Sequence, residues 1–148
     1  FNPPRYMRLL ELVTGPQTNK KIAETIRNFC DVKLGKGVVE CKDTPGFIAN
    51  RIGVFWLMTA LRKAIELGVT VEQADAVMGK PVGIPKTAVF GLFDLIGIDL
   101  MPLIASEMLK TLPQQDAFRS MYQVPDVVQK MLKEGYTGRK GKGGFYRL

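Results

Sequence analysis

The sequence contains no histidine in its 148 residues. Histidine is the side chain whose unperturbed pKa suits proton transfer near neutral pH. Its absence excludes Ser-His-Asp and Cys-His nucleophiles, most zinc sites and a histidine general base made by this chain alone. The chain also opens on Phe1-Asn2-Pro3-Pro4 without an initiator methionine, so we expect it to be a piece of a larger protein that supplies any imidazole the chemistry needs.

Cysteines and long apolar runs are scarce as well. Cys30 and Cys41 are too few for the disulfide framework of a small secreted domain. The longest apolar stretch, residues 52–61, contains Gly53 and is followed by basic residues, so it falls short of the roughly 20 residues that cross a bilayer. We expect no membrane span, and a location in the bacterial cytoplasm or an organelle matrix.

Basic side chains outnumber acidic ones, with 21 Lys and Arg against 14 Asp and Glu and a net charge of +7. They are scattered along the chain, and the one tight cluster is Arg139-Lys140-Gly141-Lys142. Scattered charge predicts a solvated surface and no nucleic-acid partner, because a phosphate-tracking site needs a continuous basic stripe. A phosphorylated small molecule and a basic interaction module that binds nucleic acid are the alternatives.

The first forty residues alternate between strand and helix patterns. Residues 8–13 form a short apolar run that ends at a Thr-Gly-Pro turn, which predicts a buried strand. Residues 18–34 repeat apolar side chains every three or four positions, as an amphipathic helix does, and residues 38–41 predict a second strand. This β-α-β piece, residues 1–42, is expected to be one domain's remnant and too small to stand alone.

Residues 43–148 carry a helical pattern and are expected to form a second, all-helical domain. Asp43 or Thr44 suits a helix cap and Pro45 a first helical position, which predicts a helix over 45–67. Apolar residues cover most of its circumference, so we expect a central helix buried on several sides. The other helices are predicted over 70–79, started by a Thr70-x-x-Gln73 capping box, over 90–96, stopped by Gly97, over 100–112, capped by Asp99, and over 125–134.

The remaining residues, 136–148, form a tail rich in glycine and lysine. Its Gly-Arg-Lys-Gly-Lys-Gly-Gly run lacks the strand before and the helix after that a phosphate-binding loop requires, so a structural turn is favoured. The tail closes on Gly144-Phe145-Tyr146, which we expect to anchor it on the helices.

Two polar residues stand out because they interrupt apolar patterns. Glu11 lies within Leu9-Leu10-Glu11-Leu12-Val13, where a buried carboxylate would need a partner. Strand alternation could turn Glu11 to solvent, or the carboxylate could accept a hydrogen bond from a catalytic group outside the chain. Asn50 lies early in the long helix, where it could bond a neighbouring loop or point into an active-site cleft.

Four separated motifs resemble the 3-hydroxyacyl-CoA dehydrogenase family, in the family's order and across nearly the whole chain. They are Phe1-Asn2-Pro3-Pro4-Arg5-Tyr6-Met7 with Leu9-Leu10-Glu11, Lys42-Asp43-Thr44-Pro45-Gly46-Phe47-Ile48-Ala49-Asn50-Arg51, Gly91-Leu92-Phe93-Asp94-Leu95-Ile96-Gly97-Ile98-Asp99, and Gly138-Arg139-Lys140-Gly141-Lys142-Gly143-Gly144-Phe145-Tyr146. The resemblance implies a mainly α fold, in which a Rossmann-like β-α-β remnant precedes the helical C-terminal domain. The Asn-Pro-Pro-Arg-Tyr-Met version is similar to multifunctional β-oxidation proteins.

The resemblance also implies a function and roles for the two polar residues. The intact enzyme would oxidise an (S)-3-hydroxyacyl-CoA to the 3-ketoacyl-CoA with NAD, using a histidine that the family places just before Phe1. Glu11 would hold that histidine as its catalytic partner, and Asn50 would bind the substrate. The chain lacks the Gly-rich NAD turn, so it is expected to be inactive alone and not to bind NAD. A homodimer through the helical domain is implied, and a 3-hydroxybutyryl-CoA dehydrogenase is the alternative enzyme.

Overall fold

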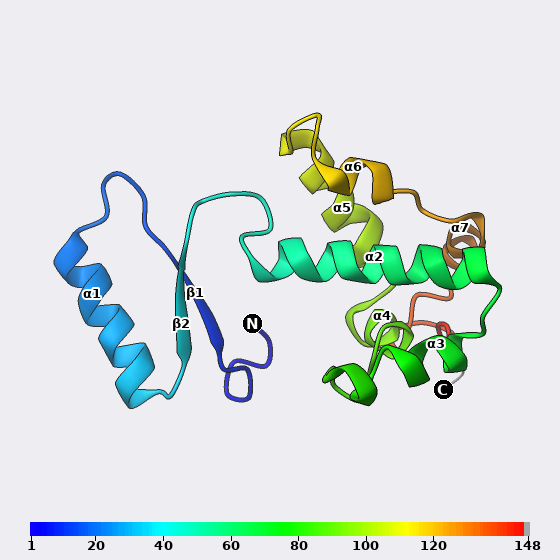
Figure 1. Cartoon of the computed structure of the whole chain (residues 1–148), viewed down its shortest axis with the longest axis horizontal. Helices are drawn as coiled ribbons and strands as arrows, with labels where there is room; N and C mark the ends of the chain where they lie inside the picture. Colours follow the sequence, from blue (N-terminus) through cyan, green and yellow to red (C-terminus); the bar gives the residue numbers. More distant parts are fainter. Residues whose placement is uncertain (147–148) are drawn as a thin grey trace. The chain divides into compact units, whose positions relative to one another are not determined.

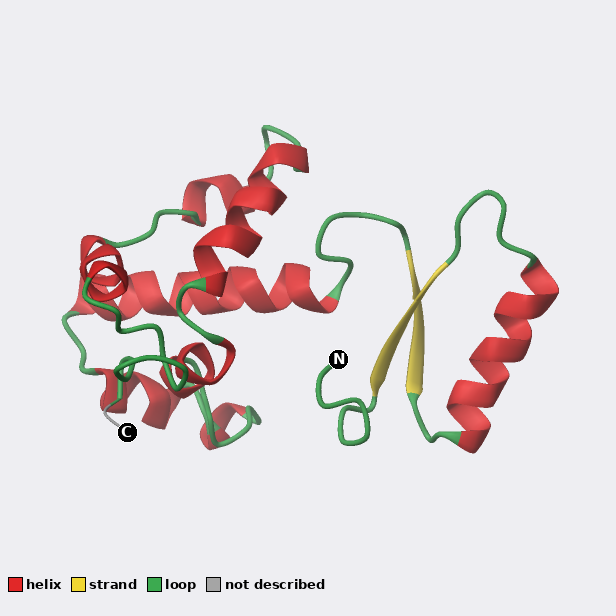
Figure 2. Cartoon of the chain, turned by 180° about the vertical axis from the view of Figure 1, so that it is seen from behind, coloured by secondary structure: helices red, strands yellow, loops and turns green. Residues whose placement is uncertain are grey.

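The computed structural model describes residues 1–146, and the chain divides into two compact units, Phe1–Arg51 and Ile52–Leu148 (Figure 1). Arg147 and Leu148, the end of the predicted tail, lie outside the described residues. Figure 2 shows both strands in the first unit, whereas the second unit consists of helices and loops. The mainly α architecture with a β-α-β segment at its start is therefore confirmed.

The first unit is a single parallel β-α-β element. Strands β1 (Leu9–Val13) and β2 (Gly37–Cys41) pair in parallel, with Glu11 opposite Val39. Helix α1 (Lys20–Asn28) and a π-helical turn, η1 (Phe29–Lys33), form the crossover that parallel strands require. Asn19 starts α1, because its side-chain oxygen accepts hydrogen bonds from the next turn's backbone N–H groups.

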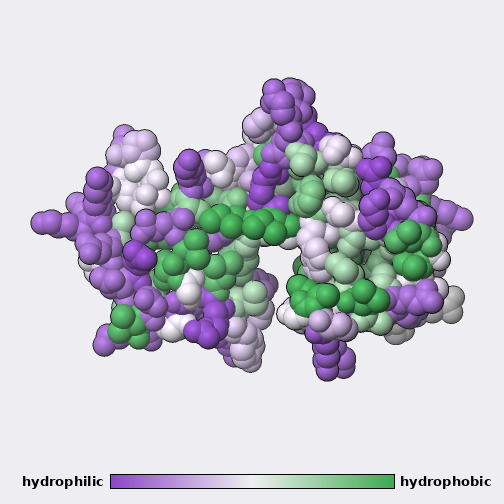
Figure 3. Space-filling view, viewed as in Figure 1, coloured by the Kyte–Doolittle hydropathy of each residue, from purple (hydrophilic) through white to green (hydrophobic). Residues whose placement is uncertain are grey.

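The prediction that residues 8–13 form a buried strand is wrong. All five β1 residues are half-buried, and Cys30 is the one fully buried apolar residue of this unit. Along α1 and η1, Ile22, Ile26 and Phe29 keep 58%, 45% and 54% of their surface exposed. A two-stranded sheet offers too little area to cover the apolar face of a helix. Figure 3 shows the resulting apolar surface in green over this unit.

Up to residue 146, the second unit contains seven helical segments, and the first of them, α2, begins in the first unit. They are α2 (Ala49–Leu67), α3 (Val71–Val77), the 3-10 turn η2 (Lys80–Val82), α4 (Phe90–Ile96), α5 (Leu100–Thr111), α6 (Ala117–Met121) and α7 (Asp126–Lys133). Within the described part of the chain, no helix is both long enough and apolar enough to traverse a membrane.

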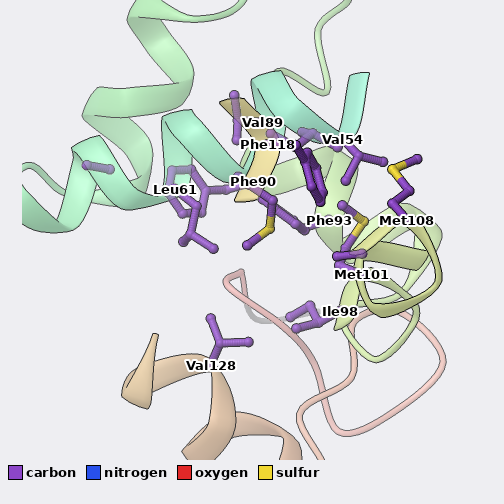
Figure 4. Close-up of a cluster of buried hydrophobic side chains, with 14 of the residues drawn as sticks. Val54, Leu61, Val89, Phe90, Phe93, Ile98, Met101, Met108, Phe118 and Val128 are labelled. Carbon is purple, nitrogen blue, oxygen red and sulfur yellow. The ribbon is translucent and has the colours of Figure 1, made fainter. Parts of the chain in front are cut away.

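One face of α2 supplies the spine of the core. Val54, Leu57, Met58 and Leu61 recur at helical spacing and are all at most 6% exposed. Figure 4 shows buried side chains that pack with this stripe, from α4, α5, α6, α7 and the segments next to α4: Val89, Phe90, Phe93, Ile98, Met101, Met108, Phe118 and Val128. The expectation of a helix covered on several sides is wrong, because Ile52 and Ile65, off the stripe, remain exposed.

Some of the predicted helix ends are confirmed, and others are wrong. The Thr70 capping box is present with both of its hydrogen bonds, and α4 ends at Gly97. Asp99 precedes α5, but its backbone is already helical and its side chain makes no capping hydrogen bond, so that expectation is wrong. Helix α6 was not predicted; Asp116 starts it by accepting a hydrogen bond from Phe118 N at 2.8 Å.

The predicted anchoring of the tail is confirmed. Phe145 packs edge-on against Phe90, with ring centroids 4.8 Å apart. The backbone N–H groups of Phe145 and Tyr146 donate to the two carboxylate oxygens of Asp94, at 2.8 and 2.9 Å. The glycine-rich run before the anchor is a structural turn, closed by an antiparallel bridge between Gly138 and Gly143.

Candidate active site

The candidate site lies in the first unit, where the chain turns from β2 into α2. The predicted helix start at Pro45, with a cap from Asp43 or Thr44, is wrong: α2 begins at Ala49. Gly46 and Phe47 both adopt left-handed backbone conformations, with φ of 75° and 48°, and this interrupts the helix. The turn is closed by Phe47 N, which donates to Thr44 O at 2.9 Å.

Glu11 caps this helix from the neighbouring strand. Its Oε1 accepts hydrogen bonds from Ile48 N at 3.0 Å and from Ala49 N at 2.7 Å. Free backbone N–H groups and the partial positive charge at a helix N-terminus both favour a carboxylate there. The half-buried Glu11 therefore binds the protein backbone and does not simply face solvent. No local pattern could reveal this, because the bonded residues are 37 and 38 positions apart.

The second carboxylate oxygen of Glu11 remains available. Among residues 1–146, Oε2 has no hydrogen-bond partner, since both bonds go to Oε1. The surroundings are anionic: partial burial, Glu11 and Asp43 together raise the pKa of the Cys41 thiol at the end of β2. A field that disfavours a thiolate favours a cation, so the site suits a positively charged hydrogen-bond donor.

Asn50 lies at the same helix end as Glu11. It is the second residue of α2, directly after Ala49, whose N–H group donates to Glu11. Asn50 is exposed, and its amide makes no hydrogen bond with the described residues, so the expected bond to a neighbouring loop is not seen. An exposed amide offers both a donor and an acceptor to a ligand. The structure thus brings the two predicted site residues to one end of α2.

The described residues show neither a glycine-rich dinucleotide turn nor a cluster of metal ligands. The β1–α1 connection, residues 14–19, contains a single glycine, whereas a pyrophosphate-binding turn needs several to let the backbone approach the phosphates. Within the described range, no three His, Cys, Asp or Glu side chains gather in a way that could hold a metal ion. What the described residues provide is a carboxylate oxygen and an amide side chain without hydrogen-bond partners.

Two further carboxylates escaped the sequence analysis. Asp75 accepts hydrogen bonds from Val89 N, Phe90 N and Gly91 N at 2.8 to 3.0 Å and so caps α4, while Asp94 is 5% exposed and binds the tail. Asp94 interrupts an apolar run just as Glu11 does, so the same signal could have found it. Asp75 had no such signal, because its partners lie 14 to 16 residues away.

Two models of one protein family together match nearly the whole chain. The family model for the 3-hydroxyacyl-CoA dehydrogenase C-terminal domain matches residues 46–148, and the model for the NAD binding domain of the same family matches residues 1–44. A Rickettsia felis protein carrying the name of a fatty acid oxidation complex trifunctional enzyme is 47% identical over 148 residues, all of this chain and 21% of that protein.

Two other relatives extend the match. The human mitochondrial hydroxyacyl-coenzyme A dehydrogenase is 35% identical over 147 residues, covering 99% of this chain and 45% of that enzyme. The crystal structure of (S)-3-hydroxybutyryl-CoA dehydrogenase PaaH1 from Ralstonia eutropha has a TM-score of 0.81 and 28% identity, covering all of this chain and 50% of that one. The chain thus spans between a fifth and a half of these relatives, and it belongs to the 3-hydroxyacyl-CoA dehydrogenase family.

Proposed function

We propose that the protein to which this chain belongs is an NAD-dependent (S)-3-hydroxyacyl-CoA dehydrogenase of fatty-acid β-oxidation. The observation that carries the proposal is the carboxylate of Glu11, fixed through Oε1 at the start of α2 and free at Oε2, in a chain of this family that has no histidine of its own. The imidazole and the NAD site would come from outside the chain. The domain limits, 1–42 and 43–148, are kept as part of the proposal.

Glu11 would act as the partner of the imidazole that removes the substrate's hydroxyl proton. Oε2 would accept the Nδ1–H of the imidazole, which fixes its tautomer and orientation and stabilises the imidazolium that forms. The two backbone bonds to Oε1 remove the freedom of the carboxylate to rotate away. A residue held in this way is pre-organised for its task, and an exposed, unrestrained glutamate would not be.

Asn50 would bind the substrate. Its amide is exposed at the first turn of α2, one residue after the backbone groups that fix Glu11. Donation from the amide to a carbonyl oxygen would hold the acyl group in line with the imidazole without taking part in proton transfer.

The test is turnover by the intact protein that contains this chain. Glu11→Gln keeps an oxygen that can accept both backbone bonds but replaces Oε2 by an NH₂ group, which cannot accept from an imidazole. We expect kcat for 3-hydroxyacyl-CoA oxidation to fall about 100-fold or more, with NAD affinity unchanged. Glu40→Gln, on the exposed surface of β2, is the matched control. Normal turnover by Glu11→Gln would remove Glu11 from the site.

A second candidate is a 3-hydroxybutyryl-CoA dehydrogenase, favoured by the likeness to the Ralstonia eutropha enzyme of that name. The two candidates share the chemistry and differ in acyl length. Values of kcat/KM for C4, C10 and C16 hydroxyacyl-CoA substrates separate them, because a short-chain enzyme loses activity as the chain grows.

We also propose a homodimer formed by the helical unit and a location in the bacterial cytoplasm or an organelle matrix. A groove of about 430 Å³ between α2 and α3 supports the dimer, since nine of its twelve lining residues are apolar, among them Trp56, Leu67 and Val77. Val77 is 63% exposed, a large value for a valine in an apolar groove. Sedimentation equilibrium of the intact protein and of Val77→Asp tests the dimer, and monomers at micromolar concentration in the unaltered protein would exclude it.

A further inference from the structure

One glycine lies inside α2 and leaves open space beside the helix. Gly53 is half-buried and is the fifth residue of α2, which runs from Ala49 to Leu67. A Cβ atom added at Gly53 would meet nothing within 4 Å. After proline, glycine is the least favourable residue in a helix interior, because it has the most backbone freedom to lose on folding. No contact among residues 1–146 explains why α2 has a glycine at this position.

Other glycines of the chain are explained by their surroundings. Several adopt a left-handed φ that side chains disfavour. A Cβ at Gly79 would lie 2.8 Å from Asp75 O, and one at Gly91, in α4, would already touch Asp75 Oδ2 at 3.8 Å. Gly37 also has open space, but it is an exposed residue that begins β2. Gly53 therefore differs from the other glycines described, since its missing side chain leaves room in the middle of a helix.

The open space beside Gly53 adjoins the amide of Asn50. Residues three positions apart are neighbours on a helix surface, about 4.5 Å apart along the axis. Because Cα–Cβ bonds tilt toward the helix N-terminus, a side chain at position 53 would cover the turn that carries Asn50. The Asn50 amide is exposed and has no hydrogen-bond partner among the described residues. An unpartnered polar group and a bare stretch of backbone thus lie next to each other on one helix.

The same side of α2 continues to an aromatic ring. Trp56 follows Gly53 by three positions and is half-buried. The row Asn50, Gly53, Trp56 therefore begins with an amide, has no side chain at its middle position and ends with an apolar ring. This order matches the chemistry of an acyl group, whose carbonyl can accept from an amide and whose hydrocarbon chain can pack on bare backbone and on an aromatic side chain.

We propose that Gly53 determines acyl-chain length, because the open space beside it receives the hydrocarbon chain of a long-chain 3-hydroxyacyl-CoA. This role rests on the proposed function and deepens it, since it favours long-chain substrates over the four-carbon one. A four-carbon acyl group ends beside the carbonyl that Asn50 would bind, so it does not extend to Gly53. A larger side chain at position 53 would obstruct the longer chains alone.

The test compares substrates of two lengths in variants of the intact enzyme. Gly53→Leu fills the open space, and Gly37→Leu, which puts the same side chain on the exposed glycine of β2, is the matched control. We expect Gly53→Leu to lower kcat/KM about 10- to 100-fold for a C16 hydroxyacyl-CoA and less than about threefold for the C4 substrate. The Kd of the C16 3-ketoacyl-CoA, measured by calorimetry, should rise by a similar factor. Gly37→Leu should leave the ratio of C16 to C4 activity unchanged.

Three results would overturn the inference. Equal losses for C4 and C16 would mean that residue 53 supports the structure or faces the reacting end of the substrate. Unchanged values for both would mean that the open space lies away from the substrate. A changed oligomeric state of Gly53→Leu in sedimentation would assign the space to a polypeptide. Should Gly53→Leu fail to fold, Gly53→Ala, which favours the helix, takes its place, and an unchanged C16 to C4 ratio in that variant contradicts the role of Gly53.

The unaltered protein separates this inference from the proposed function. If it oxidises 3-hydroxyacyl-CoA but prefers C4 to C16, the inference fails and the proposed function stands. If it oxidises no 3-hydroxyacyl-CoA of any length, the proposed function fails, and the role of Gly53 fails with it.

Discussion

The two units of this chain keep their shape by different means. In the second unit, aromatic and aliphatic side chains from α2, α4, α5, α6 and α7 bury one another almost completely. In the first unit Cys30 is the one buried apolar side chain, and order rests on the strand ladder, the Asn19 cap and the bonds made by Glu11 and Lys36. Polar contacts therefore fix the geometry of the first unit, whereas side-chain packing fixes the geometry of the second.

The two carboxylates that cap helix starts, one in each unit, also differ in how they are bonded. Asp75 uses both oxygens within the protein, since Oδ1 accepts from two backbone groups and Oδ2 accepts from Gly91 N and from the Tyr146 hydroxyl. Glu11 uses Oε1 alone. Both residues cap a helix, yet only Glu11 keeps an oxygen for a further partner among the described contacts. The spare oxygen, rather than the cap, distinguishes a candidate catalytic carboxylate from a structural one.

Truncation of one phenylalanine in each unit should give the largest contrast. Phe93→Ala removes a 2% exposed ring and should cost about 3 to 5 kcal/mol of unfolding free energy, whereas Phe29→Ala, 54% exposed, should cost less than about 1 kcal/mol. Urea unfolding followed by circular dichroism and by the fluorescence of Trp56, the one tryptophan, measures both. Equal costs would mean that the first unit's apolar face is buried in solution.

Substitution of one hydrogen-bonded carboxylate in each unit should give the second largest contrast in unfolding free energy. Asp94→Asn turns an NH₂ group toward Phe145 N or Tyr146 N, and leaves one half-buried donor without an acceptor, at a cost of about 2 kcal/mol. Glu11→Gln keeps the accepting oxygen of the α2 cap and should cost less than about 1 kcal/mol. The urea midpoints of the two variants test this, with Asp99→Asn as an exposed control that makes no capping bond. A larger loss in Glu11→Gln would show that the charge, rather than the oxygen, secures the cap.

Whether a feature of the fold could be predicted from the sequence depended on how far apart its interacting residues lie along the chain. Helix α4 and its stop at Gly97, and the Thr70 capping box, were predicted because their determinants lie within a few residues. The start of α2 was missed because its cap comes from Glu11 on another element, and because Phe47 adopts a left-handed conformation that few non-glycine residues take.

The same distinction applies to the candidate site, where some features were predicted and others were not. Glu11 and Asn50 were singled out because each places a polar side chain in an apolar pattern. The burial of β1 was predicted wrongly, since periodicity tells which face is apolar but not whether enough of the chain exists to cover it. The hydrogen bonds from Lys36 to Pro4 and Met7 were not predicted either, because these partners lie 32 and 29 positions away in the sequence.

The smallest expected effect concerns the hydroxyl of Tyr146, which joins the tail to Asp75 at 2.9 Å. Burial, then the hydrogen bond to Asp75, raise the pKa of Tyr146 well above its ordinary value of about 10. The unfolded chain therefore releases this proton at a lower pH than the folded one, so the stability it contributes is complete below pH 10 and declines as the pH rises further.

Tyr146→Phe should thus lose about 1 kcal/mol at pH 8, where the hydrogen bond is intact, and differ less from the unaltered protein at pH 11. Urea midpoints at four pH values between 8 and 11, with Tyr136→Phe as a control whose hydroxyl makes no hydrogen bond in the described structure, measure the change. A difference that stays constant with pH would mean that Tyr146 ionises as readily in the folded protein as in the unfolded chain. No difference at any pH would mean that the tail anchor depends on the ring of Phe145 and the carboxylate of Asp94 alone.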